Sequence, residues 1–575
     1  MLNFLNAKQN LFFLLPLLLL TACLNESNLN QKEVIVIREM ADATTLNPVF
    51  SGGELSGIVG MQLYQTLIGI DYRSNELVGI LAKSAPSQEV DSNGRLNLTF
   101  ELREEATFDD GTPILAEDVL FSIKLNLCPA YQQMGGAAYY NFIEAFEIDN
   151  TNPRKFTIIC EDAATRNKFA AGDFAVLPRK NYDPNNVLES FSIDDLKTIE
   201  QSKNNEKLAE FATQFEANQF AFEPNFISGS GPYKLSKWEK GQFILLEKKN
   251  NWWGESIEEN IFFDARAPKI RYEIINDPVT ALTALKSGKI DFMRNIPASD
   301  FSKLESNKQL TTLSKEIFGY QYIGFNLNQP LLQSTSLRQA VAYAIPTEKI
   351  IEVVFYGQAV PTYGPFSPIQ KEFDSNFKNK YQYNLEKSKQ LLKIDQWKDF
   401  DGDGILEKGI KDDTLSLSLK YHYNAGNEQR KAVGLIMQSE FKKIGIELEV
   451  LALEWSVYLQ GLRNGEFDLF YGGVVSMPVS SDFNSLFHSE LANGGRNYAN
   501  YQSAVTDSLI QLINNEKNQN KSKDLINAFS ENIQEDLPYF FLLTPKENIA
   551  YSNALKNVSI YSIRPNYWAP EISWK

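Results

Sequence analysis

The sequence contains little of the two residues that most often bind transition metals. It has two histidines, His422 and His488, and three cysteines, of which Cys23 stands near the amino end. No cluster of histidine and cysteine therefore has the ligand spacing of a zinc site, and we expect no transition-metal site. The other two cysteines, Cys128 and Cys160, fit either one disulfide in an oxidising compartment or two buried free thiols.

Positively charged residues are also fewer than negatively charged ones. The chain has 56 lysines and arginines against 72 aspartates and glutamates, which gives a formal net charge of −16. Because nucleic acid needs a basic face to neutralise its phosphates, this balance argues against a nucleic-acid partner.

The common enzyme motifs are absent from the sequence. It has no G-x-S-x-G elbow, no Walker loop and no H-E-x-x-H helix. The segment "SGSGPY" lies on a predicted hairpin, not on the strand-to-helix turn that a nucleophilic serine requires. We therefore expect that the protein is not an enzyme.

Long apolar runs are rare, and the one that is present runs from Leu11 to Leu20. A membrane-spanning helix needs about 20 apolar residues, so this run is too short and has the pattern of a secretory signal. The residues "LTAC" that end it resemble the bacterial lipobox. The resemblance implies that residues 1–22 are a lipoprotein signal peptide and that Cys23 is lipidated. Residues 23–32 are polar and would form a flexible tether.

Strand patterns and helix patterns alternate through the rest of the chain. "EVIVIREM" has the alternation of a strand, and "EQRKAVGLIMQSEFKKIG", from Glu428 to Gly445, has the spacing of an amphipathic helix. "TTLNPVFSGGELSG" reads as a loop rich in turn residues, followed by helical spacing in "GIVGMQLYQTLIGID". This alternation predicts mixed α/β lobes in which helices cover the sheets.

Several segments, taken together and in this order, resemble the family 5 bacterial extracellular solute-binding proteins, the oligopeptide, dipeptide and nickel receptors of ABC importers. They are "LYQTLIGID" with "LVGILAKS", "LTFELREEATFDDGTPILAEDVLFSI", "GSGPYKLSKWEKGQFILLEKKNNWWG", "ALKSGKIDF", "FNLNQPLL" with "LRQAVAYAIPTEKI", and "FDGDGILEKG". The resemblance implies an α/β, two-lobed periplasmic-binding-protein type II fold that closes on ligand like a flytrap, with an extra subdomain on lobe one.

The resemblance also implies how the chain is divided and what it does. Lobe one would combine residues 33–78, 228–321 and 545–575, the extra subdomain would be 79–227, and lobe two 322–544. The implied function is the substrate-binding component of an ABC importer, with the permease and ATPase subunits as partners. The lipid on Cys23 would anchor the protein, as a monomer, to a bacterial membrane, facing the periplasm or the cell exterior.

In peptide-binding members of this family the ligand lies between the lobes as an extra strand, so that backbone hydrogen bonds give affinity. "SGGE" matches the lobe-one wall of that cleft and "YGGVV" the lobe-two wall, with glycines that would let a ligand backbone approach closely. The ligand-binding candidates implied by the match are Gly52, Gly53, Glu54, Tyr322, Gly324, Asn326, Trp455, Tyr471, Gly472, Gly473 and Val474.

One departure from the peptide-binding pattern concerns the amino end of the ligand. Peptide-binding members place an aspartate a few residues beyond the lobe-two glycines, where it meets the ammonium group of the peptide. Here Ser476 and Met477 stand at that place, and a serine cannot neutralise a buried ammonium. Asp482 or Glu54 could substitute. The sequence therefore predicts a receptor for peptides or peptide-like solutes with an altered amino-end anchor.

Two other functions stay open. The first is a receptor of the same fold for a nickel chelate or another non-peptide solute, because His488 could contact a chelated metal, although a loop histidine is more often structural. The second is a sensor or chaperone without a transport role.

The loop "DFDGDGILEKGIKDD" resembles part of a calcium loop. Asp399, Asp401 and Asp403 match the first half of the EF-hand pattern, but the twelfth position holds Ile410 in place of a bidentate glutamate. The acids at 412–413 could complete a different cage. The alternative to a structural calcium site is a solvated turn, and we expect no other cofactor.

Overall fold

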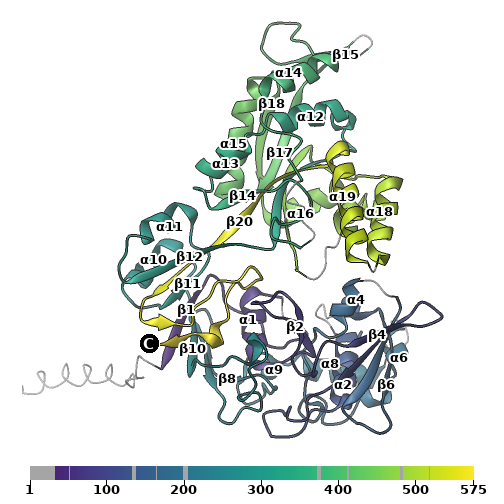
Figure 1. Cartoon of the computed structure of the whole chain (residues 1–575), viewed down its shortest axis with the longest axis vertical. Coiled ribbons are helices and arrows are strands. Elements are labelled where there is room, and N and C mark those ends of the chain that lie inside the picture. The colour runs from purple at the N-terminus through teal and green to yellow at the C-terminus, as the bar shows by residue number, and fades with distance from the viewer. Residues whose placement is uncertain are drawn as a thin grey trace, which may run out of the picture.

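Two lobes follow one another along the long axis of the molecule in the computed structural model (Figure 1). The lower lobe in this view holds the first strand and the carboxyl end of the chain, and the upper lobe is formed by the middle of the chain. The structure describes residues 33–50, 52–131, 137–162, 165–198, 205–371, 377–410, 413–478, 483–516 and 518–575. The predicted α/β, two-lobed fold is confirmed.

One sheet of 12 strands runs through both lobes, in the order β18-β17-β19-β13-β20-β11-β1-β10-β9-β8, with β12 and β14 also paired to β20. In lobe one its strands are β1 (Val34–Glu39), β8 (Tyr233–Glu239), β9 (Phe243–Lys248), β10 (Lys269–Ile274), β11 (Phe292–Met293) and β12 (Leu310–Glu316). In lobe two they are β13 (Gly319–Phe325), β14 (Ala359–Pro361), β17 (Ser418–Asn424), β18 (Glu447–Leu453) and β19 (Leu469–Val475).

Strand β20 (Tyr539–Ser552) belongs to both lobes. Its first half pairs antiparallel with β13, from Tyr539 opposite Gly324 to Leu543 opposite Gln321. Its second half pairs with β12 over residues 546–552, and its end also pairs with β11. Strands β12 and β13 follow one another in the chain, and β20 pairs with both of them. Together they form a ribbon that connects the lobes, and Figure 1 shows it crossing between them.

Several helices cover the sheet of lobe two. They are α12 (Thr335–Tyr343), α13 (Thr347–Val353), α14 (Leu385–Ile394), α15 (Glu428–Lys442), α16 (Trp455–Asn464), α17 (Asn484–Phe487), α18 (Ala504–Asn515) and α19 (Gln519–Asp536). Helix α15 is the helix predicted from Glu428. The Asn427 side chain caps its first turn by accepting the N–H of Arg430, and the chain leaves the helix just before Gly445, whose φ is 80°.

Lobe one and the extra subdomain share one hydrophobic core, which extends from Ile35 in β1 to Leu98 in β5. Lobe one adds α1 (Glu54–Leu63), β2 (Ile68–Ile70), β3 (Leu77–Gly79), α10 (Pro278–Lys286) and α11 (Ala298–Leu304). The subdomain has a sheet ordered β4-β5-β7-β6, made of β4 (Ser87–Val90), β5 (Leu96–Glu101), β6 (Ile143–Ile148) and β7 (Lys155–Cys160). Its helices are α2 (Ala116–Leu127), α3 (Ala137–Tyr140), α4 (Thr165–Ala170), α5 (Arg179–Tyr182), α6 (Ile193–Lys197), α8 (Glu206–Phe215) and α9 (Asn218–Phe222).

No helix in the described part of the chain is both long and apolar enough to cross a membrane. Residues 1–22, the tether and Cys23 lie outside the described residues. The predicted signal peptide and lipid anchor therefore stay predictions.

The two cysteines of the subdomain are free. Cys128 caps α2 and Cys160 ends β7, and both are buried. Burial raises the pKa of Cys128 to about 11 and the pKa of Cys160 to about 12. Of the two interpretations of the sequence, the structure agrees with buried free thiols, which stay protonated at neutral pH and are poor nucleophiles.

We expect the folded chain without residues 1–23 to give no reaction with a colorimetric thiol reagent at pH 8. After unfolding in guanidinium without a reductant, both thiols should react. A fast reaction of the folded protein would contradict the burial of these thiols, and an unfolded protein that still shows no thiol would indicate a disulfide.

Candidate ligand-binding site

A cavity lies between the two lobes, with a volume of about 1310 Å³ that includes open solvent at its mouth. Lobe one forms most of its wall, through α1, β2, α4 and the C-terminal residues Ile563 and Arg564. Lobe two contributes Val475, Ser476 and Met477, at the end of β19. Because both lobes line a single cavity with mostly apolar walls, this cavity is the candidate ligand site.

The face of α1 that borders the cavity carries two glycines, between the side chains of Ser56 and Met61. Gly57 and Gly60 both line the cavity, and a Cβ atom at either position would meet nothing within 4 Å. Leu55, Ile58 and Val59 are at most 3% exposed and pack into the core of lobe one. The segment "ELSGIVG" therefore forms a helix that is held by its buried face and leaves room along its other face.

Helix α1 begins inside the segment that the sequence predicts as a loop. Gly53 is its N-cap residue and Glu54 its first residue, so the loop ends earlier than "TTLNPVFSGGELSG" suggests. A Cβ atom on Gly52 would meet nothing within 4 Å, and one on Gly53 would lie 3.5 Å from Ser56 Oγ. Neither glycine borders the cavity as the structure describes it, and ligand contact at Gly52 and Gly53 stays a prediction.

Strand β19, which carries the predicted "YGGVV", has a free edge. It pairs with β13 along its whole length, from Leu469 opposite Phe325 to Val475 opposite Gly319. On its other edge the pairing with β17 extends only to Phe470. Within the described residues no strand covers that edge from Gly472 onward. An extended ligand has the geometry to add there as a strand, next to the cavity.

Three of the predicted lining residues have packing roles. The ring of Tyr322 occupies the space that a Cβ atom on Gly472 would need, and the ring of Phe470 does the same at Gly324. Tyr322 is 2% exposed, and its ring packs against that of Tyr539 with centroids 4.8 Å apart. The absence of a side chain at Gly324 and Gly472 is therefore explained by neighbouring aromatic rings, without a ligand.

Asn326 and Tyr471 are also turned away from the cavity. Asn326 Nδ2 donates to the carbonyl oxygens of Gly465 and Phe467, each at 2.8 Å, and the side chain is buried. The Tyr471 hydroxyl donates to Gln321 Oε1, and Tyr471 is buried as well. These two side chains hold lobe two together, and neither borders the cavity.

Three other predicted residues of lobe two remain accessible. Gly473 lies on the exposed part of β19, and Val474 beside it is half-buried. Trp455 starts α16 and is 52% exposed, with its ring 6.2 Å from that of Tyr458. Ligand contact by Gly473, Val474 and Trp455 stays a prediction.

Glu54 has a partner in lobe one. Arg294 Nη1 donates to Glu54 Oε1 at 2.8 Å, and Arg294 Nη2 donates to Glu39 Oε2 at 2.8 Å. The side chains of Arg294 and Glu39 are 3% and 4% exposed, whereas that of Glu54 is 48% exposed. Burial acts to lower the pKa of Arg294, but the Glu39 and Glu54 carboxylates outweigh burial and hold this pKa well above its usual range. Glu54 could serve a ligand ammonium only by sharing its carboxylate with Arg294.

The residues that replace the expected aspartate do reach the cavity. Ser476 and Met477 line it, and Ser476 Oγ has no hydrogen-bond partner in the described structure. Asp482, the other predicted substitute, lies outside the described residues.

Three polar residues of the cavity wall are not marked by any sequence motif. Asp173 is the one acidic residue and Arg564 the one basic residue among the described residues that line the cavity. Gln65 also lines it and is 4% exposed, and neither Nε2 nor Oε1 of its amide has a partner in the described structure. These groups lie far apart in the sequence, and no spacing rule would have joined them.

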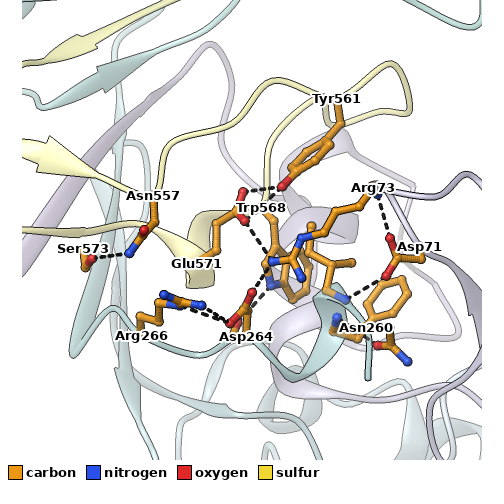
Figure 2. Close-up of polar contacts among 12 residues, drawn as sticks. Asp71, Arg73, Asn260, Asp264, Arg266, Asn557, Tyr561, Trp568, Glu571 and Ser573 are labelled. Atoms are coloured by element: carbon orange, nitrogen blue, oxygen red, sulfur yellow. Dashed lines mark hydrogen bonds and ion pairs between the residues drawn. The ribbon is translucent and has the colours of Figure 1, made fainter. Parts of the chain in front are cut away.

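A polar network fastens the C-terminal segment to lobe one (Figure 2). Asp71 Oδ1 accepts the N–H of Arg73 at 2.7 Å. The Arg73 guanidinium pairs with Asp264 and with Glu571, and the Tyr561 hydroxyl donates to Glu571 Oε1 at 2.8 Å. Charged and polar groups linked in this way fix the geometry of the chain that carries them. The network holds the C-terminal segment at the wall of the cavity.

The calcium-like loop brings four carboxylates together. Asp399, Asp401, Asp403 and Glu407 place one oxygen each within 4.8 Å of one another, and Glu407 is the member that the EF-hand pattern does not indicate. Asp399 accepts the N–H of Gly402 at 2.6 Å, a bond that a solvated turn also makes. None of the four borders the cavity. Calcium binding by this loop stays a prediction.

His488 has a local partner. Its Nδ1 accepts the N–H of Glu490 at 3.3 Å, in the cap of the short helix η4 (Ser489–Leu491). His488 is not among the described residues that line the cavity, and its contact with a chelated metal stays a prediction.

The family model of the bacterial extracellular solute-binding proteins, family 5 Middle, matches residues 76–494 of this chain. The oligopeptide-binding protein AppA of Bacillus subtilis is 29% identical over 539 residues, which cover 93% of this chain and 90% of AppA. The dipeptide-binding protein of Escherichia coli is 22% identical over 557 residues and 93% of each chain.

Two solved structures are similar to this chain in fold. The structure of Bacillus subtilis AppA in complex with a nonapeptide is similar with a TM-score of 0.69 and 25% identity, over 94% of this chain and 99% of that chain. NikZ from Campylobacter jejuni in complex with Ni(L-His) has a TM-score of 0.69 and 23% identity, over 94% of this chain and 99% of that one. Similarity at this lower identity bears on the fold alone.

Proposed function

The chain belongs to the bacterial extracellular solute-binding proteins of family 5, and we propose from this that it is the substrate-binding component of an ABC importer that captures peptides or peptide-like solutes between its lobes. The observation that carries the proposal is the free edge of β19 from Gly472 onward, beside a cavity whose opposite wall includes Gly57 and Gly60 of α1. A strand edge offers N–H and C=O groups to any extended backbone, whatever its side chains.

Binding and closure follow from this arrangement. A peptide laid along β19 satisfies strand hydrogen bonds on lobe two and projects alternate side chains toward the lobe-one wall. Contacts with both lobes favour the closed form over the open form, because a ligand shifts the equilibrium by its difference in affinity for the two. The ribbon of β12, β13 and β20 is the hinge in this proposal.

The same proposal includes the anchor and the partners. Cys23, acylated after removal of residues 1–22, would hold the protein at a bacterial membrane, and residues 23–32 would act as its tether. The closed, loaded receptor would then dock on the permease subunits of the importer, whose ATPase subunits drive transport. No enzymatic activity is part of the proposal.

A chelated metal is a less suitable cargo for this cavity. Imidazole and thiolate are the side chains that bind nickel or zinc most readily, and the described lining of the cavity contains neither histidine nor cysteine. The predicted nickel-chelate alternative therefore has less support than peptide binding.

Native mass spectrometry of the chain without residues 1–23, purified from cells without refolding, tests the proposed function. We expect adducts that, on denaturation, are released as a set of short peptides. Release of a metal chelate or of a single non-peptide solute would contradict the peptide proposal. If the protein is empty, titration with random peptide pools should produce adducts, and failure of every pool would contradict it as well.

A further inference from the structure

Asp173 presents a carboxylate at the cavity wall. The Tyr139 and Tyr140 hydroxyls each donate to it at 3.1 Å, and no lysine or arginine of the described structure pairs with it. Burial raises the pKa of Asp173 to about 7, and the two hydroxyls offset this only in part. The carboxylate therefore lies where its charged form is disfavoured, and a nearby cation would stabilise it.

Gln65 lies next to the segment that carries Asp173. Its backbone carbonyl accepts the N–H of Val176 at 3.0 Å, so the strand-like segment after Asp173 runs beside it. The Gln65 side chain is more than nine-tenths buried and lines the cavity, yet its amide has no partner in the described structure. Burial of an amide without hydrogen-bond partners lowers the stability of the protein. The Gln65 amide is therefore present at a cost in stability.

The wall around these two groups is apolar. Helix α4, which Figure 1 shows at the edge of lobe one that faces lobe two, contributes Phe169. The other apolar side chains in this lining include Met61, Ile68, Ile70, Tyr72 and Phe262. A flexible hydrocarbon stem with a polar tip could cover this wall and reach an acceptor at its end.

We propose, on the basis of the proposed peptide function, that the cavity binds an ammonium or guanidinium group at the end of an apolar stem, with Asp173 and the Gln65 amide oxygen as its acceptors. A lysine or arginine side chain of a bound peptide has this form. Its methylene groups would cover the apolar wall, and its head would make charge-assisted hydrogen bonds to Asp173. The amino terminus of a peptide carries the same charge and is the second source of this chemistry.

Calorimetric titration with pools of alanine-based peptides, three to five residues long, distinguishes a bound lysine side chain from a bound amino terminus. One pool carries lysine at each position in turn, and its match carries norleucine, which has the same stem without the ammonium. Both pools are also prepared with acetylated amino ends. The proteins are wild type, Asp173→Asn, Gln65→Met, and Asp524→Asn as the matched control on the exposed face of α19.

We expect wild type and Asp524→Asn to bind the lysine pools at least about tenfold more tightly than the norleucine pools, with or without acetylation. Asp173→Asn should reduce this preference to about twofold or less. If instead acetylation removes tight binding of every pool, and Asp173→Asn removes that difference, the bound cation is the amino terminus and the proposed acceptors hold.

Equal binding of lysine and norleucine pools, unaffected by acetylation, would overturn the inference while leaving peptide binding intact. Binding of no pool at all would contradict the proposed function itself. If Asp173→Asn does not fold, Gln65→Met still tests the inference. Because it removes an unpaired amide, it should leave the melting temperature of the empty protein unchanged or higher and still weaken the preference for lysine.

Discussion

Replacing Arg294 with methionine is expected to lower the free energy of unfolding by about 3–5 kcal/mol at pH 8, since removal of one partner leaves a buried charge uncompensated. Arg294 is the cation that two carboxylates share, and Glu39 is almost fully buried beside it. Methionine keeps much of the volume and removes the charge. Urea unfolding followed by circular dichroism measures the change.

Two comparisons test the physical reason for this loss. In Arg294→Met a buried carboxylate is left without its guanidinium partner, and acid neutralises an unpaired carboxylate, so the loss should be smaller at pH 5 than at pH 8. The double variant Arg294→Met/Glu39→Gln should recover at least about half of it. The exposed Arg496→Met should change stability by no more than about 0.5 kcal/mol. A loss that is equal at both pH values would contradict the electrostatic explanation.

Adding side chains at Gly57 and Gly60 of α1 should change stability and ligand binding in opposite directions. In the double variant Gly57→Leu/Gly60→Leu the new side chains replace glycine in a helix and meet open space, so we expect the empty protein to become more stable by up to about 1 kcal/mol per site. The same side chains enter the cavity, so affinity for peptides should fall at least about tenfold. Thermal unfolding and calorimetry measure the two effects on one preparation.

Two sets of alanine variants serve as controls for the leucine double variant. Gly461 lies inside α16, but a Cβ atom there would overlap the ring of Phe467, so Gly461→Ala should destabilise lobe two by about 1–3 kcal/mol. Gly57→Ala/Gly60→Ala should keep most of the stability gain with a smaller loss of affinity. Unchanged peptide affinity in the leucine double variant would show that ligand does not lie along α1.

The parts of the fold that follow from local pattern could be predicted from the sequence. The helix from Glu428 is predictable because its apolar spacing is a local pattern, and it forms as expected. Helix α1 was less predictable, because "SGGELSG" has the composition of a loop. It is helical because Leu55 and Ile58 find a core to bury in, and burial outweighs the low helix propensity of glycine.

The candidate site was only partly predictable, for two reasons. A glycine in a strand indicates close approach of some neighbour, and the sequence does not say whether the neighbour is a ligand or a ring such as that of Tyr322 at Gly472. Gln65, Asp173 and Arg564 meet at the cavity only through the tertiary fold, without a spacing that marks them. Ser476 and Met477 were indicated by the resemblance to peptide-binding members of the family, which place an aspartate at this point of the chain.

The path of β20 also fixes when during chain growth the receptor can become functional. Its second half completes the sheet of lobe one by pairing with β11 and β12, and the segment after it supplies Ile563 and Arg564 to the cavity wall. The first strand, β1, pairs with β10 and β11, which emerge hundreds of residues later, and such distant pairing is slow. A nascent chain that ends before Tyr539 has β12 and β13 but lacks the strand that pairs with both, and it lacks Ile563 and Arg564 of the cavity wall. Ligand capture therefore waits for the last part of the chain to be synthesised.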